Sequence, residues 1–178
     1  MHIGQHLESA RMIFRPPTMC DAADLFRIFG DPLTNRFNPA GPYKNMAVAE
    51  RKLARWIAQW EHDGYGQWVI YLKSDPARVI GFGGVANGQF GDEEKPNLGF
   101  RFATEAWGKG LATELAMFSL LTAFSTLNLP EVWGSVRENH LASRHVFEKI
   151  GMQEVEVVAD PDGAPASVIY RILQQAMS

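Results

Sequence analysis

The chain has 178 residues, of which 46% are hydrophobic and 21% are charged, and its formal net charge is −3. This composition predicts one soluble globular domain, and the acidic balance argues against nucleic acid as the main partner, since phosphate binding needs clustered Lys and Arg. The single cysteine, Cys20, excludes an intramolecular disulfide and fits a reducing compartment. The sequence shows neither a signal-peptide pattern nor an apolar run of membrane-spanning length, so we expect a cytoplasmic protein without a membrane partner.

The first third of the chain predicts one strand and two helices. Residues 9–16 alternate like an edge strand that ends at two prolines. Thr18 and Asp21 form a capping-box pattern, which predicts a helix to about residue 29. Residues 47–62 carry apolar side chains three or four positions apart and predict a second helix.

Three strands are predicted in the middle of the chain. Residues 67–73 and 79–85 are rich in β-branched and aromatic residues, and the Ser-Asp-Pro-Ala sequence at 74–77 predicts a hairpin turn between them. Residues 88–96 are polar and predict a loop. Residues 98–103 predict the third strand of this region.

The last part of the chain alternates helices and strands. Residues 110–124 predict a long helix with a buried stripe that contains Met117, Leu120, Leu121 and Phe124. A strand at 131–136, a helix at 142–150 and strands at 152–158 and 166–173 complete the chain. The resulting order, βααβββαβαββ, predicts a mixed α/β domain with one layered sheet.

A glycine-rich sequence, WGKGLAT at 107–113, stands between a strand and the long helix. Glycines let the backbone approach a ligand, and the free N–H groups at a helix start bind anions, so this loop is either a pyrophosphate site or simply a tight turn before the helix. A Walker loop is excluded because Lys109 precedes Gly110 rather than Ser or Thr. The dinucleotide pattern also fails, because Thr113 stands where its third glycine belongs.

A second motif, SRHVFEKIGM at 143–152, follows the glycine loop by about thirty residues. With LGFRF at 98–102 and WGKGLAT in the same order, the chain resembles the GCN5-related N-acetyltransferases (GNAT), and within them the RimJ/RimL-like group. The opening also resembles that group, through Arg15, the Thr18-to-Asp21 pattern and Asp31-Pro32. The resemblance covers most of the chain and is most specific over residues 98–152.

The resemblance implies a mostly antiparallel sheet flanked by helices, formed by one acetyltransferase domain over residues 1–178 with its core at 9–174. It implies direct transfer of an acetyl group from acetyl-CoA, without a metal, to a primary amine on a protein N-terminus or a small molecule. A homodimer is compatible with it. The alternative function is a catalytically weak acyl-CoA-binding module that acts as a sensor or partner protein.

The resemblance also implies the coenzyme contacts. The pantetheine arm would meet the backbone of Phe102, Ala103 and Thr104. The pyrophosphate would meet the backbone amides of Gly108, Gly110, Leu111, Ala112 and Thr113. Trp107 either packs under the loop or contacts the ligand, and Lys109 either neutralises phosphate charge or is solvated.

Two positions depart from the family pattern on the pantetheine side. The family's asparagine falls on His140, so either His140 replaces it or Asn139 serves after a shift of one residue; a plain surface histidine is the third interpretation. Phe147 stands where many relatives carry a tyrosine acid. Since a phenylalanine side chain donates no proton, we expect Phe147 to pack beside the coenzyme arm.

Catalytic and acceptor residues are less well defined by the sequence. Ser143 is expected near the sulfur, or else it caps the last helix. His140 has a suitable intrinsic pKa for a base, and Asn97, where relatives often have Glu, can only position a water. Trp56 and Trp60 either form the floor of an acceptor pocket or pack in the core.

Overall fold

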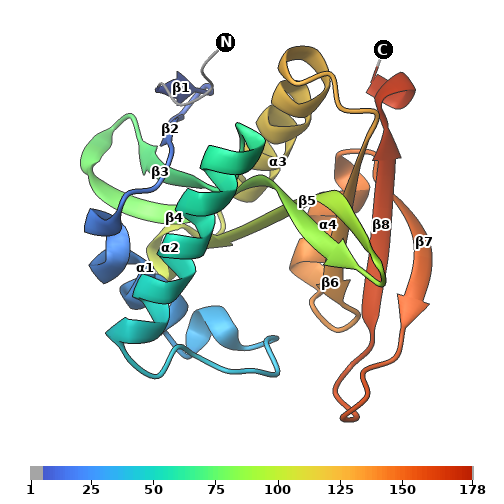
Figure 1. Ribbon diagram of the computed structural model, residues 1–178, viewed down its shortest axis with the longest axis horizontal. Coiled ribbons are helices and arrows are strands. Elements are labelled where there is room, and N and C mark those ends of the chain that lie inside the picture. The colour runs from blue at the N-terminus through green and yellow to red at the C-terminus, as the bar shows by residue number, and fades with distance from the viewer. Residues whose placement is uncertain (1–5, 178) are drawn as a thin grey trace.

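An eight-stranded sheet runs through the molecule in the order β1-β2-β3-β4-β5-β6-β8-β7 (Figure 1). The structure is a computed structural model, and it describes residues 6–177. All neighbouring strands are antiparallel except β5 and β6, which are parallel. The strands are β1 (Leu7–Glu8), β2 (Met12–Arg15), β3 (Trp68–Leu72), β4 (Asp75–Phe90), β5 (Glu93–Phe102), β6 (Glu131–Arg137), β7 (Gln153–Val158) and β8 (Ser167–Leu173).

Four helices cover the two faces of this sheet. They are α1 (Ala22–Phe29), α2 (Met46–Asp63), α3 (Leu111–Leu121) and α4 (Leu141–Lys149). Alternation along the strands separates two layers of core: Val69 on β3 packs against α1 and α2, whereas its neighbours Trp68 and Ile70 pack on the side of α3. The predicted mixed α/β fold with a mostly antiparallel sheet is confirmed.

The local signals for the first two helices are confirmed. Thr18 accepts a hydrogen bond from the Cys20 amide, and the Asp21 carboxylate accepts one from the Thr18 amide, which forms the capping box before α1. Gly64 ends α2 in the left-handed conformation, with φ of 78°. A left-handed C-terminal residue favours glycine because it has no Cβ to clash.

The predicted order lacked one strand. The two-residue strand β1 precedes β2 and pairs with it, so β2 has neighbours on both sides and is not the edge of the sheet. The observed order is therefore ββααβββαβαββ. A two-residue strand carries no periodic signal, because one alternation is indistinguishable from chance.

The predicted polar loop at 88–96 is wrong. β4 continues to Phe90 and β5 begins at Glu93, so these residues form a hairpin with a tight turn. Phe90 packs on Trp133 of β6, with ring centroids 5.7 Å apart. Residues 87–96 are half-buried or exposed, and these strands therefore carry polar side chains that resemble a loop in the sequence.

Two smaller predictions also need correction. The turn after β3 lies at Lys73 and Ser74, and a register shift in the β3–β4 ladder accommodates Pro76, which has no N–H to donate. In α3, Met117 and Leu121 are exposed rather than buried. The buried side chains of α3 divide between two core clusters because the helix packs over both halves of the sheet.

Candidate active site

The sheet splits between β5 and β6. The two strands pair at a single position, where Asn97 lies opposite Trp133. Beyond it β5 leads into the glycine loop and α3, and β6 leads into α4, so the strands separate (Figure 1). A cavity of about 650 Å3 occupies this split and is lined by both helices and by the loop at residues 33–39.

The split exposes backbone groups of β5 to the cavity. Ala103 donates its N–H to the carbonyl oxygen of Ile80 on β4, at 2.8 Å. Because hydrogen bonds alternate in direction along an antiparallel strand, the backbone groups of Phe100 and Phe102 point the other way, toward the cavity. Of the three residues expected to meet the pantetheine arm, Phe102 lines the cavity. The backbone N–H of Ala103 faces β4 instead, and neither Ala103 nor Thr104 lines the cavity.

The glycine loop presents free amides at the start of α3. Gly108 and Gly110 have φ of 74° and 75°, a left-handed conformation that favours glycine. Gly110 caps α3 with no side-chain hydrogen bond to the first amides of the helix. Those amides and the positive end of the helix dipole form an anion site that a pyrophosphate fits. Leu111, Ala112 and Thr113 line the cavity at this point.

Arg11 supports the loop from the turn between β1 and β2. Its Nη1 donates to the carbonyl oxygen of Lys109 at 2.8 Å, and its Nε donates to Glu114 Oε1 at 2.7 Å. Arg11 thereby joins the glycine loop to the first turn of α3. The sequence offered no signal for this role, because the contact spans about one hundred positions of the chain. The Lys109 side chain does not line the cavity, whereas Trp107 does and donates its Nε1–H to Phe102 O at 3.0 Å.

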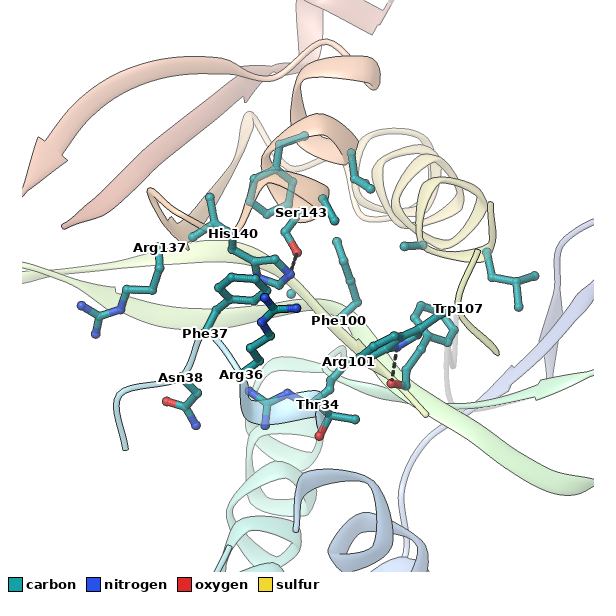
Figure 2. Close-up of a pocket in the computed structure, with 18 of the residues that line it drawn as sticks. Thr34, Arg36, Phe37, Asn38, Phe100, Arg101, Trp107, Arg137, His140 and Ser143 are labelled. Atoms are coloured by element: carbon teal, nitrogen blue, oxygen red, sulfur yellow. Dashed lines mark hydrogen bonds between the residues drawn. The ribbon is translucent and has the colours of Figure 1, made fainter. Parts of the chain in front are cut away.

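His140 and Ser143 meet inside the cavity (Figure 2). Ser143 Oγ lies 3.2 Å from His140 Nε2. The imidazole stacks on Phe37 from the loop after α1, with ring centroids 4.3 Å apart and planes 16° apart. Burial, and then the positive charge of Arg101, lower the pKa of His140 below its usual 6.5. The ring is therefore neutral at pH 7 and able to accept a proton.

Two arginines that the sequence analysis did not select face the same cavity. Arg101 lies on β5, donates from Nη1 to Asn35 Oδ1 at 2.8 Å, and places its guanidinium 4.3 Å from the centre of the Phe29 ring. Arg36 is exposed and comes from the loop after α1. Arg101 is the one charged residue in the otherwise apolar stretch 98–103, and this was the available signal for it.

The remaining coenzyme-side candidates differ in their exposure. Asn139 is exposed in the turn after β6 and does not line the cavity. Phe147 is buried and lines it, in an edge-to-face contact with Phe100 at 6.0 Å. The apolar packing expected of Phe147 agrees with this position.

The acceptor-side candidates lie outside the main cavity. Trp60 donates its Nε1–H to Gln67 O at 2.8 Å and lines neither this cavity nor the smaller one beside it. The smaller hollow, of about 200 Å3, lies between α2 and the β4–β5 hairpin, and Trp56 and Asn97 line it. Asn97 Oδ1 is buried and has no hydrogen-bond partner among the described residues.

The charged side chains that line the cavity are all positive. Its lining residues, all of them in the described part of the chain, include three arginines and no Asp or Glu. Asp92, Glu93 and Glu94 are exposed at the tip of the β4–β5 hairpin and are not among them. Residues 6–177 contain no cluster of His, Cys, Asp and Glu arranged to hold a metal ion, and no helix among them is long and apolar enough to cross a membrane.

Comparisons with known proteins agree with this fold. The acetyltransferase from Agrobacterium tumefaciens str. C58 has 26% sequence identity and superposes with a TM-score of 0.78 over 94% of each chain. Mycobacterium smegmatis RimJ in complex with CoA-disulfide has 22% identity and a TM-score of 0.77, over 99% of this chain and 92% of that one. The uncharacterized N-acetyltransferase p20 of Bacillus licheniformis is 22% identical over 165 residues, 92% of this chain and 90% of its own length.

Together with these similarities to N-acetyltransferases, the fold and the split sheet indicate an acyltransferase. The profile of the acetyltransferase (GNAT) domain matches residues 11–153. The chain belongs to the GNAT acetyltransferase family.

Proposed function

We propose that this chain transfers the acetyl group of acetyl-CoA to a primary amine by direct attack, and that it is a RimJ/RimL-like member of its family. The observation that carries the proposal is the uncapped start of α3, which opens into the same cavity as the His140–Ser143 pair. An anion site and a proton-transfer pair at two ends of one cavity suit a substrate with a pyrophosphate and a reactive acyl group. The similar fold of Mycobacterium smegmatis RimJ, which was solved in complex with CoA-disulfide, adds support.

The coenzyme would be held mainly by backbone groups. The amides from Gly108 to Thr113 would bind the pyrophosphate. The backbone N–H and C=O of Phe100, which point away from β4 into the split, would bind the pantetheine arm. Phe147 would pack against that arm. Acetyl-CoA supplies the activated acyl group, and the chain orients it.

Proton transfer would use His140 and Ser143. With a proton on Nε2, the imidazole donates to Ser143 Oγ, and Nδ1 is free to accept a proton from the attacking amine. Ser143 then donates its hydroxyl proton to the departing sulfur and takes the Nε2 proton of the imidazolium in exchange. As the C–N bond forms and the C–S bond breaks, the amine loses one proton and the thiol gains one, so the step is balanced. This pair supplies the acid that Phe147 lacks.

The position of the one cysteine supports direct attack over a cysteine acyl-enzyme. Cys20 is exposed beside the capping box and does not line the cavity. The variant Cys20→Ala should keep full turnover, measured as thiol release. Loss of turnover with intact coenzyme binding would exclude direct attack.

A thiol-release assay with acetyl-CoA and a panel of amines tests the function, with calorimetry of coenzyme binding alongside it. We expect micromolar to millimolar coenzyme affinity and acceptor-dependent thiol release. Coenzyme binding without release by any amine would support the acyl-CoA-binding module instead.

A further inference from the structure

The acceptor half of the cavity carries unbalanced positive charge. We use this name for the part formed by the loop at residues 33–39 together with Arg101, Arg137 and His140. Arg137 pairs with Asp160 at 2.8 Å. Arg36 and Arg101 form no ion pair with any carboxylate of residues 6–177 within 4 Å. Figure 2 shows Arg36 beside Phe37 and His140, and Arg101 below them on the side of Thr34.

The charge of Arg101 is held in a poorly solvated place. Its guanidinium lies over the Phe29 ring and uses the neutral amide of Asn35 as its hydrogen-bond acceptor. Burial lowers the pKa of Arg101, and burial likewise lowers the pKa of Lys52 on α2. Lys52 and Arg55 line the neighbouring small hollow, which also has no acidic residue among its described lining. Positive charge in such a place is costly unless an anion balances it.

The shape of the acceptor half favours a small ligand. The stacked rings of Phe37 and His140 join the loop after α1 to the start of α4 across the cavity. A guanidinium presents a planar fork of N–H donors that matches a carboxylate, and Arg36 can add a second cation from the rim. A polyamine or an aminoglycoside would need carboxylates here, and the described lining offers none.

We infer that the acceptor is a small aminocarboxylate whose carboxylate binds Arg101 and Arg36 while its amine faces His140. This inference rests on the proposed acetyl transfer. The same cations would also lower the pKa of the acceptor's ammonium group, which makes the neutral amine easier to reach without a carboxylate base. The acetyl group forms an amide with the amine, and the carboxylate takes no part in the chemistry.

The experiment compares matched acceptors in the thiol-release assay. The panel contains α-, β- and γ-amino acids, the carboxamide of each, polyamines, aminoglycosides and peptides with free N-termini. For the wild-type protein we expect the best amino acid to exceed its own carboxamide in kcat/KM by about 10- to 100-fold, the range for charge-assisted hydrogen bonds. An equal rate with the carboxamide, or a preference for polyamines, aminoglycosides or peptides, would overturn the inference.

Variants assign the preference to the arginines. Arg101→Gln and Arg36→Gln should each bring the ratio of kcat/KM for the amino acid to kcat/KM for its carboxamide closer to one. The change should come mainly from a lower kcat/KM for the amino acid. Arg36 is exposed, so its variant tests the idea even where Arg101→Gln disturbs the fold. Arg51→Gln, which removes an exposed charge from α2, should leave the ratio unchanged. A uniform loss with both acceptors would show a structural role and contradict carboxylate binding.

Failure of the proposed function has a different signature. If calorimetry shows no coenzyme binding, or if binding occurs without release by any amine, acetyl transfer itself is wrong and the inference falls with it. If release occurs with non-carboxylate amines alone, acetyl transfer stands and the acceptor class is wrong.

Discussion

The two halves of the cavity are built by different means. The coenzyme half consists of backbone amides at a glycine loop and the apolar side chain of Phe147, all contributed by the contiguous stretch from β5 to α4. The acceptor half consists of charged and aromatic side chains: Arg36 and Phe37 reach it from the loop after α1, and Arg101 reaches it from β5. A ligand common to a family can be held by backbone geometry, whereas a particular acceptor needs particular side chains. Substitutions in the two halves should therefore alter different kinetic constants.

The largest expected effect is at His140, where the two halves meet. His140→Gln should lower kcat by about 100-fold or more, because general acid–base catalysis contributes at least this much. Coenzyme affinity should stay within a small factor of the wild type. His145→Gln, an exposed histidine on the same helix, is the matched control. An unchanged kcat in His140→Gln would show that the base is elsewhere.

Gly110→Asp should break the coenzyme half. The added Cβ and carboxylate meet a left-handed backbone and an anion site, so coenzyme affinity should fall at least tenfold by calorimetry, about 1.4 kcal/mol or more. Gly163→Asp is the control, since Gly163 also has a positive φ, of 85°, and a Cβ there meets nothing within 4 Å. Unchanged affinity in a folded Gly110→Asp variant would reject this loop as the pyrophosphate site.

Ser143→Ala should have a smaller effect, confined to turnover. Loss of the hydroxyl that donates to the sulfur should lower kcat by about tenfold, the value of one hydrogen bond, with little change in coenzyme affinity. In a series of thioester analogues, kcat should depend more steeply on the pKa of the departing thiol in the variant than in the wild type. Equal losses in affinity and turnover would point instead to a helix-capping role.

The smallest effect is a change of pH profile. Because the pKa of His140 is below 6.5, activity should fall as the pH drops through that lowered pKa and the imidazole gains a proton. Removal of the Arg101 charge stabilises the imidazolium, so Arg101→Gln should move the acidic limb of kcat to higher pH. Burial is the larger cause and remains, so the shift should be partial. If the acidic limb of the kcat profile does not move, the charge of Arg101 does not influence the pKa of His140.

The proposed coenzyme half could be predicted from the sequence because its signals are local. A glycine that must adopt a left-handed conformation, the start of a helix and a preceding strand all lie within residues 98–113, and the second motif follows in one stretch. Backbone recognition of this kind depends on neighbours in the chain. The helices and most strands were predictable for the same reason, from periodicity and caps.

Only the tertiary structure decided the acceptor half and the support of the loop. Arg11 reaches Lys109 and Glu114 across about one hundred positions, and Phe37 reaches His140 across a similar distance. The choice between Asn139 and His140 as a cavity residue depended on the direction of one turn, and the core position of Trp60 depended on which face α2 presents. The sequence determined the family and predicted a coenzyme loop, because both depend on short-range patterns. Folding decided which distant charges meet in one cavity, since side-chain proximity across the sheet leaves no periodic trace in the chain.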